Sequence, residues 1–427
     1  MTERWLLPSD RLAYGLMGNP CYRTQETPWN TTKMQISHIA LRIASAVDEK
    51  RTLGFLKQLV RTPSVSGDET QVTELVAREM EHVGLSVESI GTNLIGKWNS
   101  RSDGNNLILC GHLDTVPVGD RKEWVFDPYG AEVRGNRLYG RGACDMKAGL
   151  SAMTMAVNAL KKADVKLLGN LTLIATVCEE VPEKLTERKG IVELLDRNAV
   201  KGKAAIIAEP TDLVIGLGHK ATCQIVAKVK GKAAHAGVPD QGINAIEKAA
   251  KLIMALKELH TANHPTLGKG TVSANLIEGG TAINVVPENC RVEIDRRLTI
   301  GENSEKAMAD LQKIIRSIQK EDEDFKAEAR CVFSYEPILI DASQPIIKSL
   351  AEAYSLVVGR TPRTGTLPYG TDGAFINHRT NIPVAIFGPG NMKHAHKPDE
   401  YVELEQVQAA AKIYAVAAVE FLGVHAP

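Results

Sequence analysis

The stretch Asn106-Leu-Ile-Leu-Cys-Gly-His-Leu-Asp-Thr-Val-Pro117 joins a short apolar run to a polar loop that contains His112. Two later apolar runs end in the same way, 171–178 before a pair of glutamates and 204–208 before Glu209. Apolar runs of this length are typical of strands in a sheet that is covered on both faces. Because ligands of such open sheets bind beyond the carboxyl ends of the strands, the sequence predicts that these polar side chains surround one crevice.

The order of the other elements indicates an α/β fold. Helical periodicity from Ile36 to Val83 breaks at Thr62–Gly67, where a serine is expected to cap the second helix. We expect strands at 86–97, 106–110, 171–178, 204–208, 223–229, 271–277, 290–298 and 382–387, and helices at 149–160, 189–197, 242–260, 304–319, 344–358 and 405–422. This alternation predicts a mixed, mostly parallel sheet with helices on both faces.

The chain divides into four predicted segments. Residues 36–221 form the first part of a main domain, and 334–427 form its second part. Between them, 222–333 changes to two helices with about four strands, which resembles a ferredoxin-like sandwich and predicts an inserted α+β domain. Residues 1–35 show no periodicity. They form either an arm packed on the body or an extension from an upstream start codon, since an amphipathic stretch follows Met34.

The composition is that of an ordinary soluble globular protein, with 44% hydrophobic and 24% charged residues. Lysine and arginine together number 51, as do aspartate and glutamate. The chain therefore lacks the excess of basic residues that would indicate binding to nucleic acid or to a membrane surface. No apolar run approaches the roughly 20 residues that span a bilayer. The seven cysteines are dispersed without a C-x-x-C pair, which favours a reduced, cytoplasmic protein. The expected partner is a small molecule.

Histidine and carboxylate side chains at strand ends are suitable ligands for zinc and related cations. His112, Asp145, the glutamate pair, Glu209 and a late histidine are too many ligands for one ion. Two ions that share a bridging carboxylate would use them all, with the metals about 3.5–4 Å apart. Asp145 suits the bridge because it lies in a tight turn between glycine-rich segments. The sequence therefore predicts a two-metal site that carries out hydrolysis.

The adjacent Glu179 and Glu180 are expected to have different roles. Consecutive side chains point apart, so one can bind a metal while the other reaches the activated water. A general base beside two metals is what amide hydrolysis requires. One glutamate of the pair is therefore predicted to be a ligand and the other the base.

Five motifs follow one another between about residue 50 and residue 425: G-H-x-D-T-V-P, G-R-G-x-x-D-M-K, E-E, E-P-T and A-H-x-P-D-E. Together they resemble the dinuclear zinc aminoacylase and carboxypeptidase family, which includes acetylornithine deacetylase, succinyl-diaminopimelate desuccinylase and the bacterial glutamate carboxypeptidase. The resemblance implies a metal-dependent hydrolase of linear amides. It also implies two divalent ions per chain, with zinc expected and cobalt or manganese as alternatives.

The resemblance implies a complete set of metal ligands in this chain. His112 and Glu209 would bind one metal, and Glu180 and His396 would bind the other. Asp145 would bridge the two ions. Each of these residues lies in one of the five motifs.

The resemblance also gives roles to residues that bind no metal. Glu179 becomes the general base, and Asp114 becomes the carboxylate that orients the imidazole of His112. Two histidines, His394 and His396, compete for the last metal position. The spacing H-x-P-D-E favours His396.

The inserted domain also acquires expected functions. The resemblance makes 222–333 the lid and dimerisation domain of a homodimer, beside a catalytic domain formed by the rest of the body. His235 would stabilise the oxyanion, in its own subunit or across the dimer. Asn284 and Arg297 would hold the substrate, Arg297 by its carboxylate, and Thr371 lies in a loop that matches an active-site loop.

Three functions are compatible with these residues. The first is removal of the acyl group from an N-acyl amino acid, as in acetylornithine deacetylase or succinyl-diaminopimelate desuccinylase. The second is cleavage of a short peptide by a dipeptidase or carboxypeptidase of the same family. The third, an inactive metal-binding relative, is disfavoured because the proposed base and every ligand type are present. The charged segment 181–190 departs from the glycine-rich loop of many relatives, so no relative's specificity can be transferred.

Overall fold

The computed structural model describes residues 38–98, 105–180 and 190–425. The predicted N-terminal segment 1–35 and most of the charged segment after the glutamate pair lie outside the described residues. Within the described part, no helix combines the length and the apolar character needed to cross a membrane. The six cysteines described are free. The cytoplasmic location stays a prediction.

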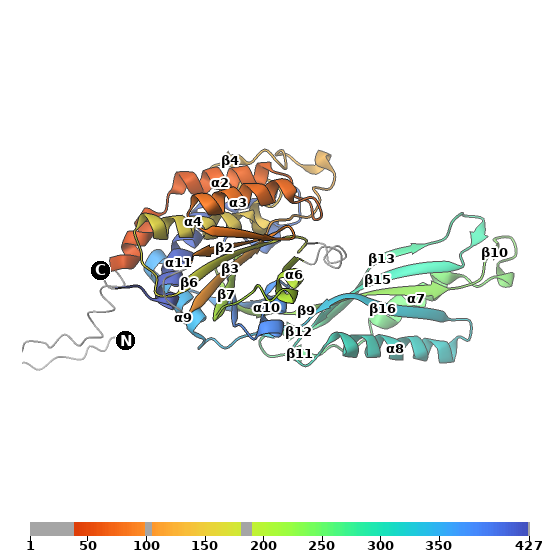
Figure 1. Ribbon diagram of the computed structural model, residues 1–427. Coiled ribbons are helices and arrows are strands. Elements are labelled where there is room, and N and C mark those ends of the chain that lie inside the picture. The colour runs from red at the N-terminus through yellow and green to blue at the C-terminus, as the bar shows by residue number, and fades with distance from the viewer. Residues whose placement is uncertain (1–37, 99–104, 181–189, 426–427) are drawn as a thin grey trace, which may run out of the picture.

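The first domain is built on a mixed sheet that has nine strands among the described residues (Figure 1). Their order across the sheet is β1 (Ser86–Ile90), β2 (Asn93–Trp98), β6 (Asn170–Thr176), β3 (Asn106–His112), β7 (Ala204–Ile207), β19 (Val384–Ile386), β8 (Ile215–His219) and β17 (Ile338–Leu339), with β18 (Thr364–Leu367) also paired to β8. The central strands β6, β3, β7 and β19 are parallel, whereas the neighbours β1, β2 and β17 pair antiparallel. The predicted α/β class is confirmed.

Helices cover both faces of this sheet, because alternate residues of each buried strand point to opposite sides. In β3, Leu107 and Leu109 pack into the larger apolar cluster, and Ile108 and Cys110 pack into the other. The helices on the larger-cluster side are α2 (Glu49–Arg61), α3 (Thr70–His82), α4 (Ala148–Lys162), α9 (Pro345–Val358) and α11 (Leu404–Leu422). Those on the other side are α6 (Gly190–Asp196) and α10 (Gly373–Thr380).

Helix α4 is the central helix of the first domain, and its residues from Ala148 to Leu160 are all buried. Small side chains allow this close packing. A Cβ atom on Gly149 would lie 2.0 Å from the carbonyl oxygen of Ala208, so only glycine fits at this contact. The contact brings the beginning of α4 against the end of β7. The turn that precedes α4 therefore lies close to Glu209, which follows β7.

The second domain contains a separate antiparallel sheet, which extends away from the first domain (Figure 1). Its strand order is β13 (Thr271–Gly279), β15 (Asn289–Leu298), β9 (Ala221–Lys230) and β16 (Lys326–Tyr335). Helices α7 (Ala245–Leu256) and α8 (Ser304–Glu321) pack on it around a core that includes Val292 and Leu311. The predicted α+β unit is confirmed. The exact division of the chain at 222 and 333 stays a prediction.

Two local features differ from the sequence analysis. The break between the first two helices is present, but Glu69 rather than a serine occupies the N-cap of α3. The serines of the break bond elsewhere, because Ser64 donates to the carbonyl oxygen of Leu113 and Ser66 donates to the carboxylate of Asp114. A small sheet of three-residue strands was not predicted, and it consists of β20 (Tyr401–Glu403), β5 (Arg137–Tyr139) and β4 (Glu132–Arg134).

Candidate metal centre

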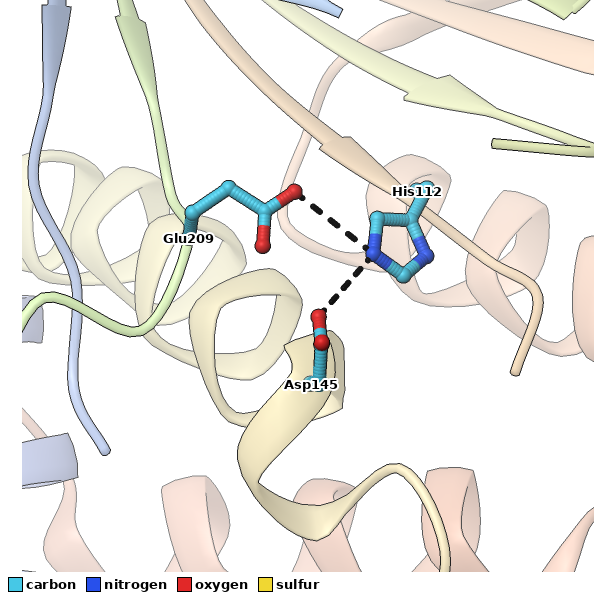
Figure 2. A group of neighbouring side chains, drawn as sticks. All are labelled: His112, Asp145 and Glu209. Carbon is cyan, nitrogen blue, oxygen red and sulfur yellow. Dashed lines mark hydrogen bonds and ion pairs between the residues drawn. The ribbon is translucent and has the colours of Figure 1, made fainter. Parts of the chain in front are cut away.

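The first group of candidate ligands consists of His112, Asp145 and Glu209 (Figure 2). His112 ends β3 and Glu209 follows β7, and these two parallel strands end at the same edge of the sheet. The Nε2 atom of His112 lies 3.2 Å from Oδ1 of Asp145 and 3.6 Å from Oε1 of Glu209. All three residues are less than 5% exposed. The group is a buried cluster of one imidazole and two carboxylates.

The second group consists of Asp145, Glu180 and His396. The Nε2 atom of His396 lies 3.0 Å from Oε1 of Glu180 and 3.3 Å from Oδ2 of Asp145. Because Oδ1 of the same aspartate faces His112, the two oxygens of Asp145 point toward different histidines. Asp145 is therefore the residue shared by the two groups, in the place that a bridging ligand would occupy.

Two residues to which the sequence analysis gave no role hold the turn that carries Asp145. Both oxygens of Glu400 are used, Oε1 by the backbone N–H groups of Cys144 and Asp145, at 2.9 and 3.0 Å, and Oε2 by Nη1 of Arg141 at 2.5 Å. Glu400 is 1% exposed and Arg141 2%. Both belong to quoted motifs, Arg141 to G-R-G-x-x-D-M-K and Glu400 to A-H-x-P-D-E. Their presence in these motifs is the sequence signal from which a role for Arg141 and Glu400 could have been predicted.

The glutamate pair is divided between two positions. Glu180 lies in the second ligand group, whereas Glu179 belongs to neither group and its Oε2 lies 4.0 Å from Nε2 of His112. Burial raises the pKa of Glu179 well above the ordinary value. Glu179 therefore lies beside the ligands with a carboxyl group of high proton affinity, which a proton acceptor requires.

Asp114 fixes the backbone that carries this pair. Its carboxylate accepts hydrogen bonds from the backbone N–H of Glu179 at 3.1 Å, from that of Glu180 at 3.0 Å and from the hydroxyl of Ser66 at 2.5 Å. The ring Nδ1 of His112 lies 3.0 Å from the carbonyl oxygen of Asp114 but 3.7 Å from its carboxylate. In this structure the carbonyl oxygen therefore holds the imidazole, and the carboxylate holds the glutamates.

The electrostatics of the cluster show an excess of negative charge. Burial and the nearby carboxylate of Asp145 together raise the pKa of Glu180 to about 7, and the same two causes raise the pKa of Glu209 well above its ordinary value. Hydrogen bonds with Asp145 and Glu180 raise the pKa of His396 to about 10. Buried carboxylates that crowd together need positive charge beside them. Divalent cations supply such charge, and the nitrogen and oxygen donors present suit zinc-like ions.

Of the two histidines that compete for the last position, His396 lies in a ligand group. His394 lies elsewhere, with its ring against Tyr401 at a centroid distance of 4.1 Å and its Nε2 2.9 Å from the tyrosine hydroxyl. His394 is in neither candidate ligand group among the described residues.

Two of the predicted substrate residues lie at the far end of the second domain. His235 is exposed on β10 (Ala234–His235), which pairs with β14 (Val285–Val286). The carbonyl oxygen of Asn284 accepts a hydrogen bond from the backbone N–H of Ala236, so Asn284 lies beside His235. Figure 1 shows β10 at the tip of the second domain, away from the first sheet. The structure brings these two residues together but not next to the ligand groups of their own chain.

The other two predicted substrate residues lie near the junction of the domains. Arg297 is near the end of β15, and its Nε donates to Asp295 at 2.8 Å. Thr371 is only 2% exposed. Its hydroxyl oxygen lies 3.3 Å from Nε2 of His219 and accepts from the backbone N–H of Gly373 at 3.1 Å. The side chain of Thr371 therefore holds its loop in place.

Comparison with known families accounts for this arrangement. Residues 108–420 match the model of peptidase family M20/M25/M40. The chain belongs to this family. Among curated M20 relatives, the acetylornithine deacetylase of Myxococcus xanthus is 31% identical over 340 residues, covering 78% of this chain and 84% of that protein. The succinyl-diaminopimelate desuccinylase of Dinoroseobacter shibae is 28% identical over 370 residues, covering 83% of this chain and 95% of that protein.

Solved structures agree with the M20 assignment at the level of the fold. The dipeptidase Dug1p of Saccharomyces cerevisiae has a TM-score of 0.76 and 14% sequence identity, over 90% of this chain and 99% of that chain. The predicted resemblance is confirmed, and this M20 chain is a metal-dependent hydrolase of the peptidase and deacylase type. All five candidate ligands lie inside the matched region.

Proposed function

We propose that this M20 chain removes the acyl group from an N-acyl amino acid by hydrolysis of the amide bond. The observation that carries the proposal is the pair of ligand groups that share Asp145. Two groups with one common carboxylate suit a pair of ions a few ångströms apart. The relatives from M. xanthus and D. shibae are named for deacylation of amino acids, which supports this substrate class.

We assign His112 and Glu209 to one ion, Glu180 and His396 to the other, and Asp145 to both. The close approach of their ligand atoms within each group supports the assignment. Zinc is the expected metal, with cobalt or manganese as alternatives. When bound, the two ions would polarise the amide carbonyl and lower the pKa of water.

Glu179 is the proposed general base. It would accept a proton from the attacking water and deliver it to the leaving amine. Its position 4.0 Å from His112 supports this role, because the carboxylate lies beside the ligands without belonging to either group. Asp114 would act on the reaction through the backbone of Glu179, to which it is hydrogen-bonded.

Substrate binding is proposed to involve both domains. Arg297 would bind the carboxylate of the amino acid. His235 and Asn284 would act on the site of a second copy of the chain, with His235 stabilising the oxyanion. The exposed side chains of Leu276 and Ile277 on β13, an outer strand of the second sheet, support a homodimer contact in this domain. Thr371 would keep its loop in position for the substrate.

The test is a panel of N-acetyl-ornithine, N-succinyl-diaminopimelate, simple N-acetyl amino acids and dipeptides, each with zinc, cobalt or manganese. Faster hydrolysis of an N-acyl amino acid than of any dipeptide is expected. The same residues could cleave a peptide bond, so a preference for dipeptides would replace the proposal with the dipeptidase alternative. If protein that holds two metals hydrolyses no compound of the panel, the proposal is contradicted.

Elemental analysis of variants tests the ligand assignment separately. Asp145→Ala is expected to perturb both ions, whereas His396→Ala should deplete mainly one. His394→Ala is the matched control, because this ring bonds Tyr401. Loss of a metal from His394→Ala but not from His396→Ala would overturn the choice.

A further inference from the structure

Arg297 and Tyr335 lie at the same level of the second sheet, at the end where β9 begins directly after β8 of the first sheet. Arg297 of β15 and Tyr335 of β16 both pair with Thr222 of β9, one from each side. Residues directly opposite in antiparallel strands share a face of the sheet. The long side chains of Arg297 and Tyr335 therefore project from one face of the sheet, beside the junction.

The ring of Tyr335 is held by aromatic contacts from both domains. Its centroid lies 5.8 Å from that of His219 and 5.9 Å from that of Phe375, in edge-to-face arrangements, and 5.7 Å from that of Phe333. Such contacts fix the orientation of a ring. Because His219 also contacts the hydroxyl of Thr371, the ring is tied to the loop 370–373.

The hydroxyl of Tyr335 lies directly against this loop. A Cβ atom placed on Gly370 would be 1.7 Å from the hydroxyl oxygen and 2.1 Å from the ring carbon that bears it. Any side chain at position 370 would therefore displace the phenol. Glycine at this position lets the hydroxyl occupy a fixed place at the loop.

Charges on both sides act on this hydroxyl. Burial raises the pKa of Tyr335, the guanidinium of Arg297 opposes this, and the carboxylate of Glu179 adds to it. The hydroxyl thus stays protonated and remains a hydrogen-bond donor. The charges of the proposed carboxylate-binding residue and of the proposed base both act on this hydroxyl.

Arg297 alone is an incomplete site for a carboxylate. Its Nε already donates to Asp295, whose negative charge offsets part of the positive charge of the guanidinium. A substrate carboxylate has two oxygens and accepts several hydrogen bonds. A second, neutral donor beside Arg297 would complete its recognition without adding charge.

We propose that Tyr335 is a specificity-determining residue whose hydroxyl donates a hydrogen bond to the substrate carboxylate beside Arg297. The inference rests on the proposed function, because it deepens the choice of substrate at the same site. In this role, Tyr335 selects amino acids with a free carboxylate over the corresponding carboxamides. Gly370 serves this selection by leaving room for the hydroxyl.

The experiment compares Tyr335→Phe with the wild type on an N-acetyl amino acid and on the same compound with its carboxylate converted to a carboxamide. Loss of a hydrogen bond to a charged group should raise KM for the acid by about 10- to 100-fold. KM for the carboxamide should stay the same, and kcat for both should change by less than about threefold. Tyr354→Phe is the matched control, since Tyr354 lies on α9 and its hydroxyl accepts a hydrogen bond from Arg360.

Two kinetic outcomes would overturn the inference. Equal effects of Tyr335→Phe on acid and carboxamide would indicate a structural role at the junction. A fall in kcat with unchanged KM would indicate that the hydroxyl acts on the transition state. Gly370→Ala should cause the same loss of preference for the acid, and the double variant should show no further loss, because both changes remove one hydroxyl from one place.

A binding measurement separates failure of this inference from failure of the proposed function. Calorimetry on the metal-loaded protein can compare the free amino acid with its carboxamide, without any turnover. Weaker binding of the acid alone by Tyr335→Phe would support the inference even if no substrate of the panel is hydrolysed. Unchanged binding of the acid would refute it, whatever the panel shows.

Discussion

Replacement of Glu400 by glutamine tests how the bridging aspartate is held. The side chain of Glu400 is buried, pairs with Arg141, and accepts from the backbone N–H groups of Cys144 and Asp145. Glutamine keeps an oxygen for the two N–H groups but presents no charge to the arginine. Glu400→Gln therefore leaves a buried guanidinium without its carboxylate.

The expected cost is large because water cannot screen this pair, whose side chains are 3% and 1% exposed. Breaking a buried pair by removing one partner costs about 3–5 kcal/mol. Glu400→Ala should cost at least about 1–3 kcal/mol more, because it also leaves buried N–H groups without an acceptor. Glu403→Gln is the matched control. The pair that Glu403 forms with Arg137 is 3.8 Å long and about half exposed at the arginine, so its loss should cost less than about 1 kcal/mol.

The assay is denaturant unfolding at a fixed free metal concentration, together with elemental analysis of the folded protein. We expect Glu400→Gln to lower the free energy of unfolding and to reduce the occupancy of both ions, since Asp145 belongs to both groups. The reasoning is refuted if Glu400→Gln unfolds within about 1 kcal/mol of the wild type, as a surface pair would. Loss of only one ion would refute the shared position of Asp145.

Three further changes test other parts of the molecule. Glu179→Gln should keep both metals while turnover falls by about 10²–10⁴, measured by elemental analysis and initial rates. Hydrogen bonds from Lys248 and Lys251 lower the pKa of Asp322 from 3.8 to about 2. A lowered carboxyl pKa stabilises the fold above the unfolded value, so this contribution is lost as the pH falls from about 4 to 2, and Asp322→Asn should remove it from the acid-unfolding curve. Mixed dimers of His235→Ala and Glu179→Gln chains should regain activity, and no recovery after proven subunit exchange would contradict delivery between chains.

The positions of the proposed ligands could be predicted because they follow from local patterns. β3 and β7 are apolar runs whose residues pair in parallel register, so the polar residues after both runs lie at one edge of the sheet. The turn before α4 reaches the same edge because Gly149 lets that helix contact the end of β7. The sequence patterns of strands, turns and helices therefore suffice to predict that His112, Asp145 and Glu209 lie close together.

The contacts that hold these residues could not be predicted, because they join distant parts of the chain. Glu400 bonds a backbone group 255 residues away, and no local pattern indicates that pairing. Asp114 was expected to orient an imidazole, but the chain conformation directs its carboxylate to the glutamate pair. The three-residue strands β4, β5 and β20 are too short to show a period of two.

The second domain separates the proposed substrate residues into two sets. Arg297 pairs with Thr222 at the beginning of β9, the end of the sheet that leads into the first domain, whereas β10, which carries His235, lies at the tip of the second domain (Figure 1). β15 has ten residues, and strands rise about 3.3 Å per residue, so about 30 Å of sheet separates the two sets. A continuous, hydrogen-bonded sheet does not fold back on itself. Rotation of the whole domain that brought His235 to its own ligands would carry Arg297 away from them. The separation therefore supports the proposal that one complete site takes Arg297 from one chain and His235 from another.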